Sequence, residues 1–397
     1  MRSNSEESGE WIWVDRQTKL EELSEEFYCA GEIALDTEFH REKTYYPKLA
    51  LLQIAWNGKV ALLDPFALDL NVLDSVFSGP ATVVLHAGIQ DLDILARVVG
   101  SLPQSIFDTQ LAAGFIGFSN PSLAVLSERL LGIAIPKGDR LTDWTKRPLS
   151  ESQLRYASSD VANLLSLKAA IENQLVAMGR LQWAWDESKI LLDRDRSGIP
   201  MNRAWWKIKE CRHLKGDSRK VAQSLAEWRE LRAARLDIPV RYVLSDLAIA
   251  VISQDMPKTF EALSSLRGVE SRFLSQGIDG EILEIIKRGR SMPDGDLCLP
   301  AIEDSDKRLK PIASLAVIWV SQLAQSIKID PLLLATRTDI AGFLNGDKDS
   351  RISTGWRNEV LGDPITKMAN GELALAVSAD GELELEVRSR IRYTLKN

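Results

Sequence analysis

The stretch EIALDTEF, residues 32–39, ends an apolar run with two carboxylates. The run Ile-Ala-Leu is typical of a buried β-strand, and Asp36 and Glu38 follow it directly. Because side chains alternate between the two faces of a strand, positions 36 and 38 point to the same side. Two carboxylates held together repel each other, and loss of solvent strengthens the repulsion. The stretch therefore predicts a positive partner between the two acids.

Strand and helix patterns alternate on both sides of this stretch. The predicted strands are 11–14, 32–39, 49–56, 59–63, 81–87 and a short one ending at 106–109. The predicted helices are 17–29, 68–76, 91–99, most of 110–131 and one long helix over about 150–178, with Ser150 as its cap. A hairpin turn is predicted at Asn57-Gly58. Strands interleaved with helices in this way predict a mixed α/β sheet covered by helices on both faces.

The second half of the chain is helical in its periodicity. Residues 183–202 carry a charge run followed by Gly and Pro, which is typical of a linker. A pattern of Trp, Asp-Ile-Pro and Asp from Trp228 onward returns, slightly respaced, as Trp, Ile-Asp-Pro and Asp from Trp319. This echo predicts a repeated helical module. The alternating stretch at 372–387 predicts a terminal hairpin.

Composition narrows the class of protein. The 397 residues carry a net charge of −7, with 45% hydrophobic residues and three widely spaced cysteines. No apolar run reaches the roughly 18 residues of a membrane span, and the polar, acidic N-terminus favours a cytoplasmic protein over a secreted one. Between Arg203 and Asp237, however, ten Lys or Arg face five acids, a local excess of +5. That excess is typical either of a phosphate-binding face or of a solvated helix face.

Further acids are predicted to meet Asp36 and Glu38. Asp91 and Asp93 begin a helix after a buried strand, while Tyr156 and Asp160 share one helix face beside its packing stripe. Carboxylates around a cleft suit Mg²⁺ or Mn²⁺. Two such ions about 4 Å apart stabilise the attacking and leaving oxygens of a phosphoryl displacement. A tyrosine hydroxyl can orient or help deprotonate the attacking water.

Four blocks of the sequence are similar to the ribonuclease D family of DEDDy 3′→5′ exonucleases. They are LDTEFHREKTYYPKLALLQIAW (35–56), LHAGIQDLDIL (85–95), FDTQLAAGF (107–115) and DWTKRPLSESQLRYASSDVANLL (143–165). WRELRAARLDIPVRYVLSD and LSSLRG resemble the family's helical HRDC module, and STGWRNEVLG resembles its divergent C-terminal region. The resemblance implies a ribonuclease H-like nuclease domain followed by all-α HRDC-like domains. The expected segments are a disordered 1–10, the nuclease domain 11–182, a linker 183–206, an HRDC domain 207–292, a linker 293–306 and a second HRDC-like domain 307–397.

The resemblance also implies roles for the acids. Asp36, Glu38 and Asp160 would bind one metal ion, with Asp36 bridging to a second ion on which Asp91 acts through water. Asp93 competes with Asp91, but the family places apolar residues directly after its acid and three and four positions on, which favours Asp91.

Three further expectations complete the implied site. Tyr156 would position the attacking water. Asp108 and Asp143 are expected to have structural or capping roles. His86, beside a buried strand, is expected to be a core histidine.

Substrate contacts are expected just beyond the acids. Phe39 is predicted either to stack on the terminal base or to pack in the core, and His40 and Arg41 either contact the last nucleotide or are plain loop residues. Lys137 and Arg140 lie in a predicted loop over the cleft, where phosphate contact and surface charge are equally expected.

The sequence thus predicts a 3′→5′ exoribonuclease that releases nucleoside 5′-monophosphates with two Mg²⁺ or Mn²⁺ ions. The resemblance implies single-stranded RNA 3′ ends, including tRNA precursors, as substrates, with no membrane and no obligate protein partner. Two alternatives remain at this point, namely a DNA 3′→5′ exonuclease and a non-catalytic RNA-binding scaffold. A metalloprotein acting on small phosphates is disfavoured by the long basic helical half.

Overall fold

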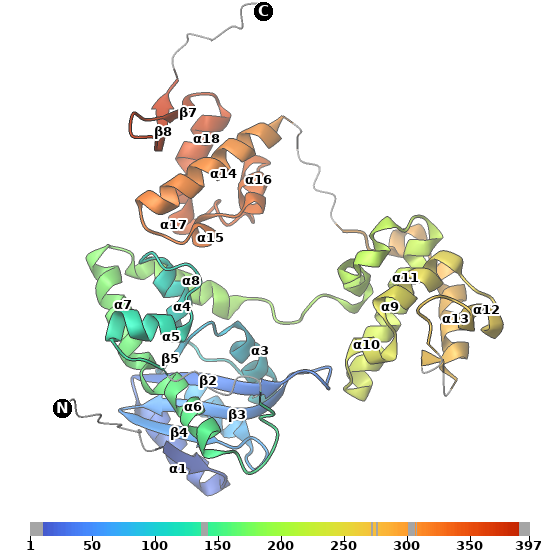
Figure 1. Ribbon diagram of the computed structural model, residues 1–397, viewed down its shortest axis with the longest axis horizontal. Coiled ribbons are helices and arrows are strands. Elements are labelled where there is room, and N and C mark those ends of the chain that lie inside the picture. The colour runs from blue at the N-terminus through green and yellow to red at the C-terminus, as the bar shows by residue number, and fades with distance from the viewer. Residues whose placement is uncertain are drawn as a thin grey trace, which may run out of the picture.

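The computed structural model describes residues 11–135, 142–270, 273–274, 277–300, 306 and 308–388. The expected disorder of residues 1–10, and the candidate residues Lys137 and Arg140, fall outside these ranges. Figure 1 shows a sheet with its helices in the first half of the chain and two helical groups after it.

The described residues of the first half form a mixed six-stranded sheet in the order β1-β4-β3-β2-β5-β6. The strands are β1 (Trp11–Val14), β2 (Glu32–His40), β3 (Lys48–Trp56), β4 (Lys59–Leu63), β5 (Thr82–Leu85) and β6 (Ile106–Asp108). β3 is antiparallel to both of its neighbours, whereas β2, β5 and β6 run parallel to one another. The predicted mixed sheet is therefore confirmed.

Helices cover both faces of this sheet, as predicted. They are α1 (Gln17–Cys29), α2 (Asp74–Phe77), α3 (Ile89–Val98), α4 (Thr109–Gly114), α5 (Leu123–Leu126), α6 (Glu151–Ala162), α7 (Leu164–Ala177) and α8 (Leu181–Asp193). In β2, Ile33 and Leu35 join one apolar core with α1 and α3, and Ala34 joins the other with α6 and α7. The alternation along β2 thus sends positions 36 and 38 to the α6 side.

The predicted long helix over 150–178 is two helices. α6 ends at Ala162 and α7 begins at Leu164, because Asn163 leaves the helical conformation with φ −107° and ψ 4°. Asparagine favours this because its side chain competes with the backbone for hydrogen bonds. The predicted cap is confirmed, since the Ser150 side chain accepts from the Gln153 N–H and the Gln153 side chain accepts in return from the Ser150 N–H.

Residues 181–193 form α8, where a linker was expected from residue 183. Buried side chains hold this helix in place, although the charged residues among them made its sequence resemble a linker. Ala184 and Leu191 are buried in the two cores of the first half, and Glu187 is buried with them. α8 therefore belongs with the sheet.

The first helical group follows and has a core of its own. Two 3₁₀ segments (Met201–Lys207 and Lys209–His213) lead into α9 (Asp217–Leu236), α10 (Val240–Val243), α11 (Asp246–Asp255), α12 (Phe260–Ser264) and α13 (Ile278–Arg290). α9 ends at Leu236, and the next residue, Asp237, has a φ of 48° that reverses the chain ahead of Pro239. The Ser245 side chain caps α11 by accepting a hydrogen bond from the Ala248 N–H.

The second helical group repeats this order of elements. It comprises α14 (Leu309–Ser326), α15 (Pro331–Leu334), α16 (Arg337–Leu344), α17 (Gly355–Arg357), α18 (Asp363–Ala369) and the hairpin β7 (Leu373–Val377) and β8 (Leu383–Val387). In both groups a long helix is followed by a residue with positive φ, a four-residue helix and a capped helix. The predicted repeat and terminal hairpin are therefore confirmed.

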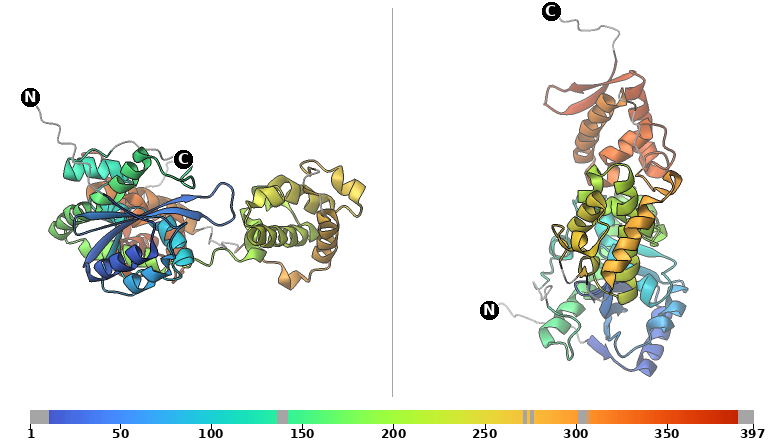
Figure 2. Two further views of the ribbon diagram at one scale, coloured as in Figure 1. Left: turned by 90° about the horizontal axis from the view of Figure 1, so that it is seen from below. Right: turned by 90° about the vertical axis from the view of Figure 1, so that its right-hand side faces the viewer.

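The two groups contact the first half at different places. The second group shares an apolar core with the sheet, where Trp356 packs edge-on against Phe115 at 5.1 Å between ring centres. The first group meets the loop between β2 and β3, which Figure 2 shows extending toward it. Among the described residues, no helix has the length and apolar character that a bilayer crossing requires.

Candidate active site

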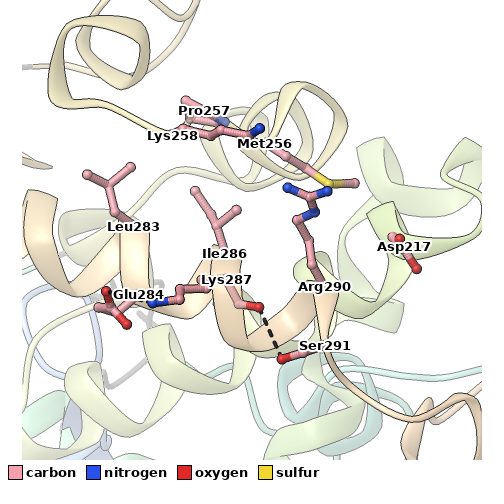
Figure 3. Close-up of a pocket in the computed structure, with 10 residues that line it drawn as sticks. All are labelled: Asp217, Met256, Pro257, Lys258, Leu283, Glu284, Ile286, Lys287, Arg290 and Ser291. Carbon is pink, nitrogen blue, oxygen red and sulfur yellow. Dashed lines mark hydrogen bonds and ion pairs between the residues drawn. The ribbon is translucent and has the colours of Figure 1, made fainter.

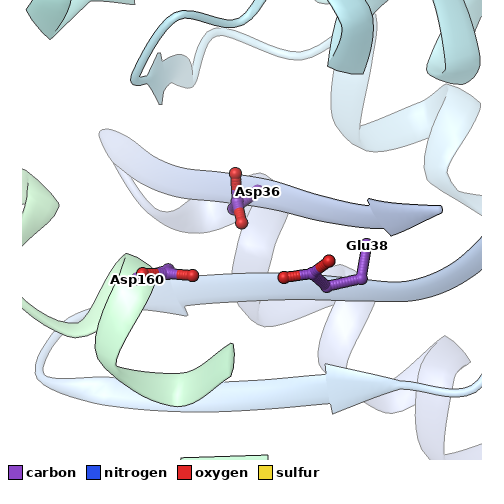
Figure 4. Close-up of side chains that lie close together, drawn as sticks. All are labelled: Asp36, Glu38 and Asp160. Atoms are coloured by element: carbon purple, nitrogen blue, oxygen red, sulfur yellow. The ribbon is translucent and has the colours of Figure 1, made fainter. Parts of the chain in front are cut away.

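Three carboxylates converge on one face of the sheet. Asp36 and Glu38 come from β2, and Asp160 comes from α6, which packs over that strand. One oxygen atom from each of the three lies within 4.8 Å of the others (Figure 4). The structure therefore brings together the acids that were predicted from positions more than 120 residues apart.

Electrostatics at Asp36 favour a cation. Burial raises the pKa of its carboxyl well above the usual value, and the negative charges of Asp91, Asp160 and Glu38 raise it further. A divalent cation would reverse this, because it stabilises the ionised carboxylates. A close set of carboxylate oxygens is the donor set that Mg²⁺ and Mn²⁺ prefer. The residues present therefore fit such an ion.

Asp91 lies just outside this cluster. It is in the first turn of α3, is only 7% exposed, and its carboxylate accepts a hydrogen bond from the hydroxyl of Thr37, the residue between the two β2 acids. Burial raises the pKa of Asp91 to about 6, against the opposing effect of the Thr37 hydrogen bond. Its charge in turn raises the pKa of Asp36, which places the two carboxylates within electrostatic range.

Asp93 points elsewhere. Its carboxylate is 47% exposed and lies 3.3 Å from Nε of Arg196, in the segment after α8. Of the two competing acids, Asp91 is the one that lies beside Asp36.

Tyr156 completes one wall of a cavity of about 260 Å³ that also contains Asp36, Glu38 and Asp160. It precedes Asp160 by one turn of α6, so both side chains face the same space. The phenol ring is 8% exposed and packs against Trp144, with 6.1 Å between ring centres. This packing fixes the ring beside the acids.

His86 also lines this cavity, together with Gln110 and Ser122, although the sequence predicted a core histidine. It directly follows β5, and its Nδ1 lies 3.0 Å from the Thr109 hydroxyl. The sequence signal that could have placed His86 at the site was its position directly after a strand, because ligands in parallel sheets bind beyond the carboxyl ends of the strands.

The three predicted substrate residues that the structure describes, Phe39, His40 and Arg41, do not line the cavity. Phe39 packs against the core on the α1 side, after a bulge between Glu38 and Phe39. His40 is half-buried near Asp143, whose pKa is lowered mainly by hydrogen bonds from Thr145. Arg41 is exposed, and of the described residues that line the cavity none is Phe39, His40 or Arg41.

The structural roles expected of two other acids are confirmed. Asp108 caps α4 through the N–H groups of Gln110 and Leu111, and it also accepts from Gly88. Asp143 accepts from the backbone and the hydroxyl of Thr145. Asp108 thereby joins the start of α4 to the loop that carries His86.

Comparison with known proteins identifies the family. The sequence matches the family described as 3′-5′ exonuclease over residues 11–176 and the HRDC domain family over residues 218–286. It is 32% identical over 355 residues to ribonuclease D of Granulibacter bethesdensis, covering 87% of this chain and 89% of that protein. The chain belongs to the ribonuclease D family. It is also 31% identical to ribonuclease D of Escherichia coli, covering 87% of this chain and 95% of that one.

A solved structure agrees with the family at the level of the whole chain. The crystal structure of Escherichia coli RNase D, described as an exoribonuclease involved in structured RNA processing, aligns with a TM-score of 0.81 at 28% identity. The alignment covers 91% of this chain and 99% of that one. The protein is therefore a 3′→5′ exoribonuclease with a metal-dependent exonuclease domain, and the family acts in tRNA processing.

Proposed function

We propose that this enzyme removes nucleoside 5′-monophosphates from the single-stranded 3′ ends of tRNA precursors and other stable RNAs. The observation that carries the proposal is the meeting of Asp36, Glu38, Asp160 and Tyr156 in one cavity on the face of the sheet that α6 covers. The cavity, of about 260 Å³, is open to solvent, so a single-stranded 3′ end can reach the acids that line it.

Asp36, Glu38 and Asp160 would hold one Mg²⁺ or Mn²⁺ ion, and Asp36 together with Asp91 would serve a second. When bound, the two ions lower the pKa of the attacking water and stabilise the charge on the leaving 3′ oxygen. Asp91 lies outside the three-acid cluster, and its carboxylate accepts a hydrogen bond from the Thr37 hydroxyl. This position supports contact between Asp91 and the second ion through water rather than directly.

Tyr156 would orient the attacking water by a hydrogen bond at its hydroxyl oxygen. Its packing against Trp144 supports this role, because a fixed ring holds the water in one direction relative to the acids. The three acids are half-buried, so their electrostatic contacts would be stronger than those between fully exposed side chains.

We propose that the nuclease unit extends from residue 11 to Asp193, since α8 is part of its cores. The first helical unit would begin at Met201 and continue to Cys298. The buried Trp205 belongs to its core and donates its indole N–H to the Cys298 carbonyl, within segments predicted as linkers.

A cytoplasmic location is supported by the three cysteines, each of which is a free thiol.

The test is hydrolysis of 3′-labelled RNA and of DNA with the same sequence, in Mg²⁺, Mn²⁺ or EDTA. We expect metal-dependent release of labelled 5′-monophosphate from RNA and none in EDTA. An Asp36→Asn variant should lose this release. Asp69→Asn should keep it, because Asp69 is an exposed acid that caps a 3₁₀ helix and does not line the cavity. Release in EDTA, full activity of Asp36→Asn, or preference for DNA would contradict the proposal.

A further inference from the structure

A second cavity, of about 520 Å³, lies in the first helical group. It lies where the segment before the HRDC match at 218–286, and the first residues of that match, meet the segment after it. Trp206, Arg212, Arg219, Leu299 and Pro300 are among the residues that line it. Parts of the two flanking segments were predicted to be linkers, and the basic stretch at 203–237 left a phosphate-binding face and a solvated helix face as alternatives.

The wall of this cavity is apolar and fixed in place. The indole N–H groups of Trp205 and Trp206 both donate to the Cys298 carbonyl, at 3.2 and 3.0 Å. With these donors satisfied, the half-buried Trp206 presents only its ring to the surroundings. Leu299 is 45% exposed beside it. A rigid indole next to exposed apolar surface is suited to stacking against a flat ring system.

The rim of the cavity is positive and unneutralised. Arg212 and Arg219 line it, and the Arg203 guanidinium lies 5.2 Å from the centre of the Trp206 ring. Among the described residues, no carboxylate forms an ion pair with these three arginines, and no acid lines the cavity. Arg219 donates from Nε to the Leu214 carbonyl, which orients the guanidinium while leaving its terminal nitrogens available.

Neighbouring basic residues differ in this respect. Lys220 pairs with Asp294 at 2.6 Å, Arg229 with Asp246 at 2.6 Å and Arg232 with Glu281 at 3.0 Å. These cations are neutralised within the helical group, whereas Arg203, Arg212 and Arg219 have no such acid partner among the described residues.

The other large cavity of this group is less suited to a phosphate. It has a volume of about 580 Å³, and Asp217 and Glu284 line it together with Lys258, Lys287 and Arg290. Figure 3 shows Glu284 beside Lys287 on one side and Asp217 on the other. Acids and bases therefore alternate around it, and it has no consistent sign of charge.

We propose that the Trp206 cavity binds one unpaired nucleotide of the RNA substrate. The base stacks on the wall formed by Trp206 and Leu299, and Arg212 and Arg219 hold the adjoining phosphate. Aromatic faces combined with arginine bind single-stranded nucleic acid in this way without reading its sequence. The proposal rests on the RNA substrate of the proposed function and adds a second point of attachment outside the acidic cavity.

Equilibrium binding tests the site without hydrolysis. The full-length protein, in EDTA, is titrated into a fluorescent RNA hairpin with a single-stranded 3′ tail, and anisotropy gives Kd. We expect Trp206→Leu to weaken binding about tenfold through lost stacking. Arg212→Ala should weaken it severalfold and lower the slope of log K against log salt by about 0.7, the effect of one lost phosphate contact on a single strand.

Arg288→Ala is the matched control, because Arg288 is an exposed arginine of α13 that does not line the cavity. It removes the same charge and should leave Kd within twofold. Equal binding by Trp206→Leu, Arg212→Ala and Arg288→Ala would overturn the proposal. If Trp206→Leu does not fold, judged by circular dichroism, Arg212→Ala with its salt slope decides alone.

Crosslinking identifies the occupant. RNA carrying 4-thiouridine in its tail should crosslink to a peptide that contains Trp206, and absence of that peptide would overturn the assignment. Loss of the crosslink on adding an equal nucleotide concentration of free 5′-monophosphate would assign the cavity to the released product instead. Because neither measurement needs hydrolysis, an RNA that binds here but is never cleaved would contradict only the proposed function.

Discussion

The Tyr45 hydroxyl donates a hydrogen bond of 2.8 Å to Glu230, 185 positions later in the chain. The backbone N–H groups of Tyr45 and Tyr46 donate to a carboxylate oxygen of Asp237, at 3.1 and 3.2 Å. The loop between β2 and β3 is thereby attached to α9 through Glu230, and to Asp237, the residue that directly follows α9. Burial, and then Glu230, raise the pKa of Tyr45, so the phenol remains a donor throughout the neutral range.

A Tyr45→Phe variant tests this attachment. Loss of one partly buried hydrogen bond to a carboxylate should weaken the contact by about 1 kcal/mol, or roughly fivefold in its opening equilibrium. We expect backbone amides of residues 41–47 to exchange hydrogen about fivefold faster, as measured by mass spectrometry. Tyr28→Phe, at a phenol 48% exposed on α1, is the control. Unchanged exchange in the loop would mean that the Tyr45 hydroxyl does not hold it.

Asp91→Asn and Asp93→Asn form a matched pair, two positions apart on α3. Asp91→Asn should lower kcat on RNA at least 100-fold, equivalent to about 3 kcal/mol, if the carboxylate serves a metal ion. Asp93→Asn should remain within twofold, because it removes only the ion pair between this 47% exposed carboxylate and Arg196. Steady-state hydrolysis of a 3′-labelled oligoribonucleotide measures both, and the reverse order of effects would assign the role to Asp93.

The raised pKa of Asp91 predicts a pH dependence of stability. The folded state holds a proton on Asp91 up to about pH 6, whereas the unfolded chain releases it near 3.8. Between these values the folded state binds more protons, so in EDTA the contribution of Asp91 to stability falls as pH rises. The Tm of Asp91→Asn should therefore exceed the Tm of the native protein by a margin that grows between pH 4 and pH 7. Parallel melting curves for the two proteins would contradict this.

Metal binding should follow the opposite trend. Because a cation competes with the protons on Asp36 and Asp91, the increase in Tm caused by 5 mM Mn²⁺ over EDTA should grow across the same pH interval. Differential scanning fluorimetry measures it, with Asp36→Asn as the variant that should show little increase. A Mn²⁺-induced increase that is constant from pH 4.5 to 7.5 would contradict competition at these carboxylates.

The sequence was most informative where chemistry and local pattern coincide. The position of Asp36 and Glu38 directly after an apolar run, and of Tyr156 and Asp160 one helical turn apart, predicted side chains on shared faces. α8 was missed because its buried positions are separated by charges, one of which, Glu187, is itself buried. The contacts of Tyr45 were unpredictable because they depend on where α9 lies relative to β2. The excess of Lys and Arg between residues 203 and 237 overestimated the number of unpaired positive charges. Lys220, Arg229 and Arg232 are neutralised by acids that lie further along the sequence.

Glu187 also joins the second helical group to the nuclease unit. It accepts hydrogen bonds of 2.5 and 2.7 Å from the two terminal nitrogens of Arg357, and both residues are at most 5% exposed. Trp356 donates its indole N–H to the same carboxylate at 3.1 Å. Arg357→Met would leave the Glu187 charge buried without its main partner, which typically costs about 3–5 kcal/mol.

We expect Arg357→Met to lower Tm by several degrees. We also expect it to make the second helical group more sensitive to limited proteolysis. The double variant Glu187→Gln/Arg357→Met removes both charges and should recover most of the loss, because no unpaired charge then remains buried. Lys367→Ala, which breaks an exposed pair with Asp363 in α18, should change Tm by less than a degree. If Arg357→Met and Lys367→Ala melt alike, the buried pair does not hold the second helical group against α8.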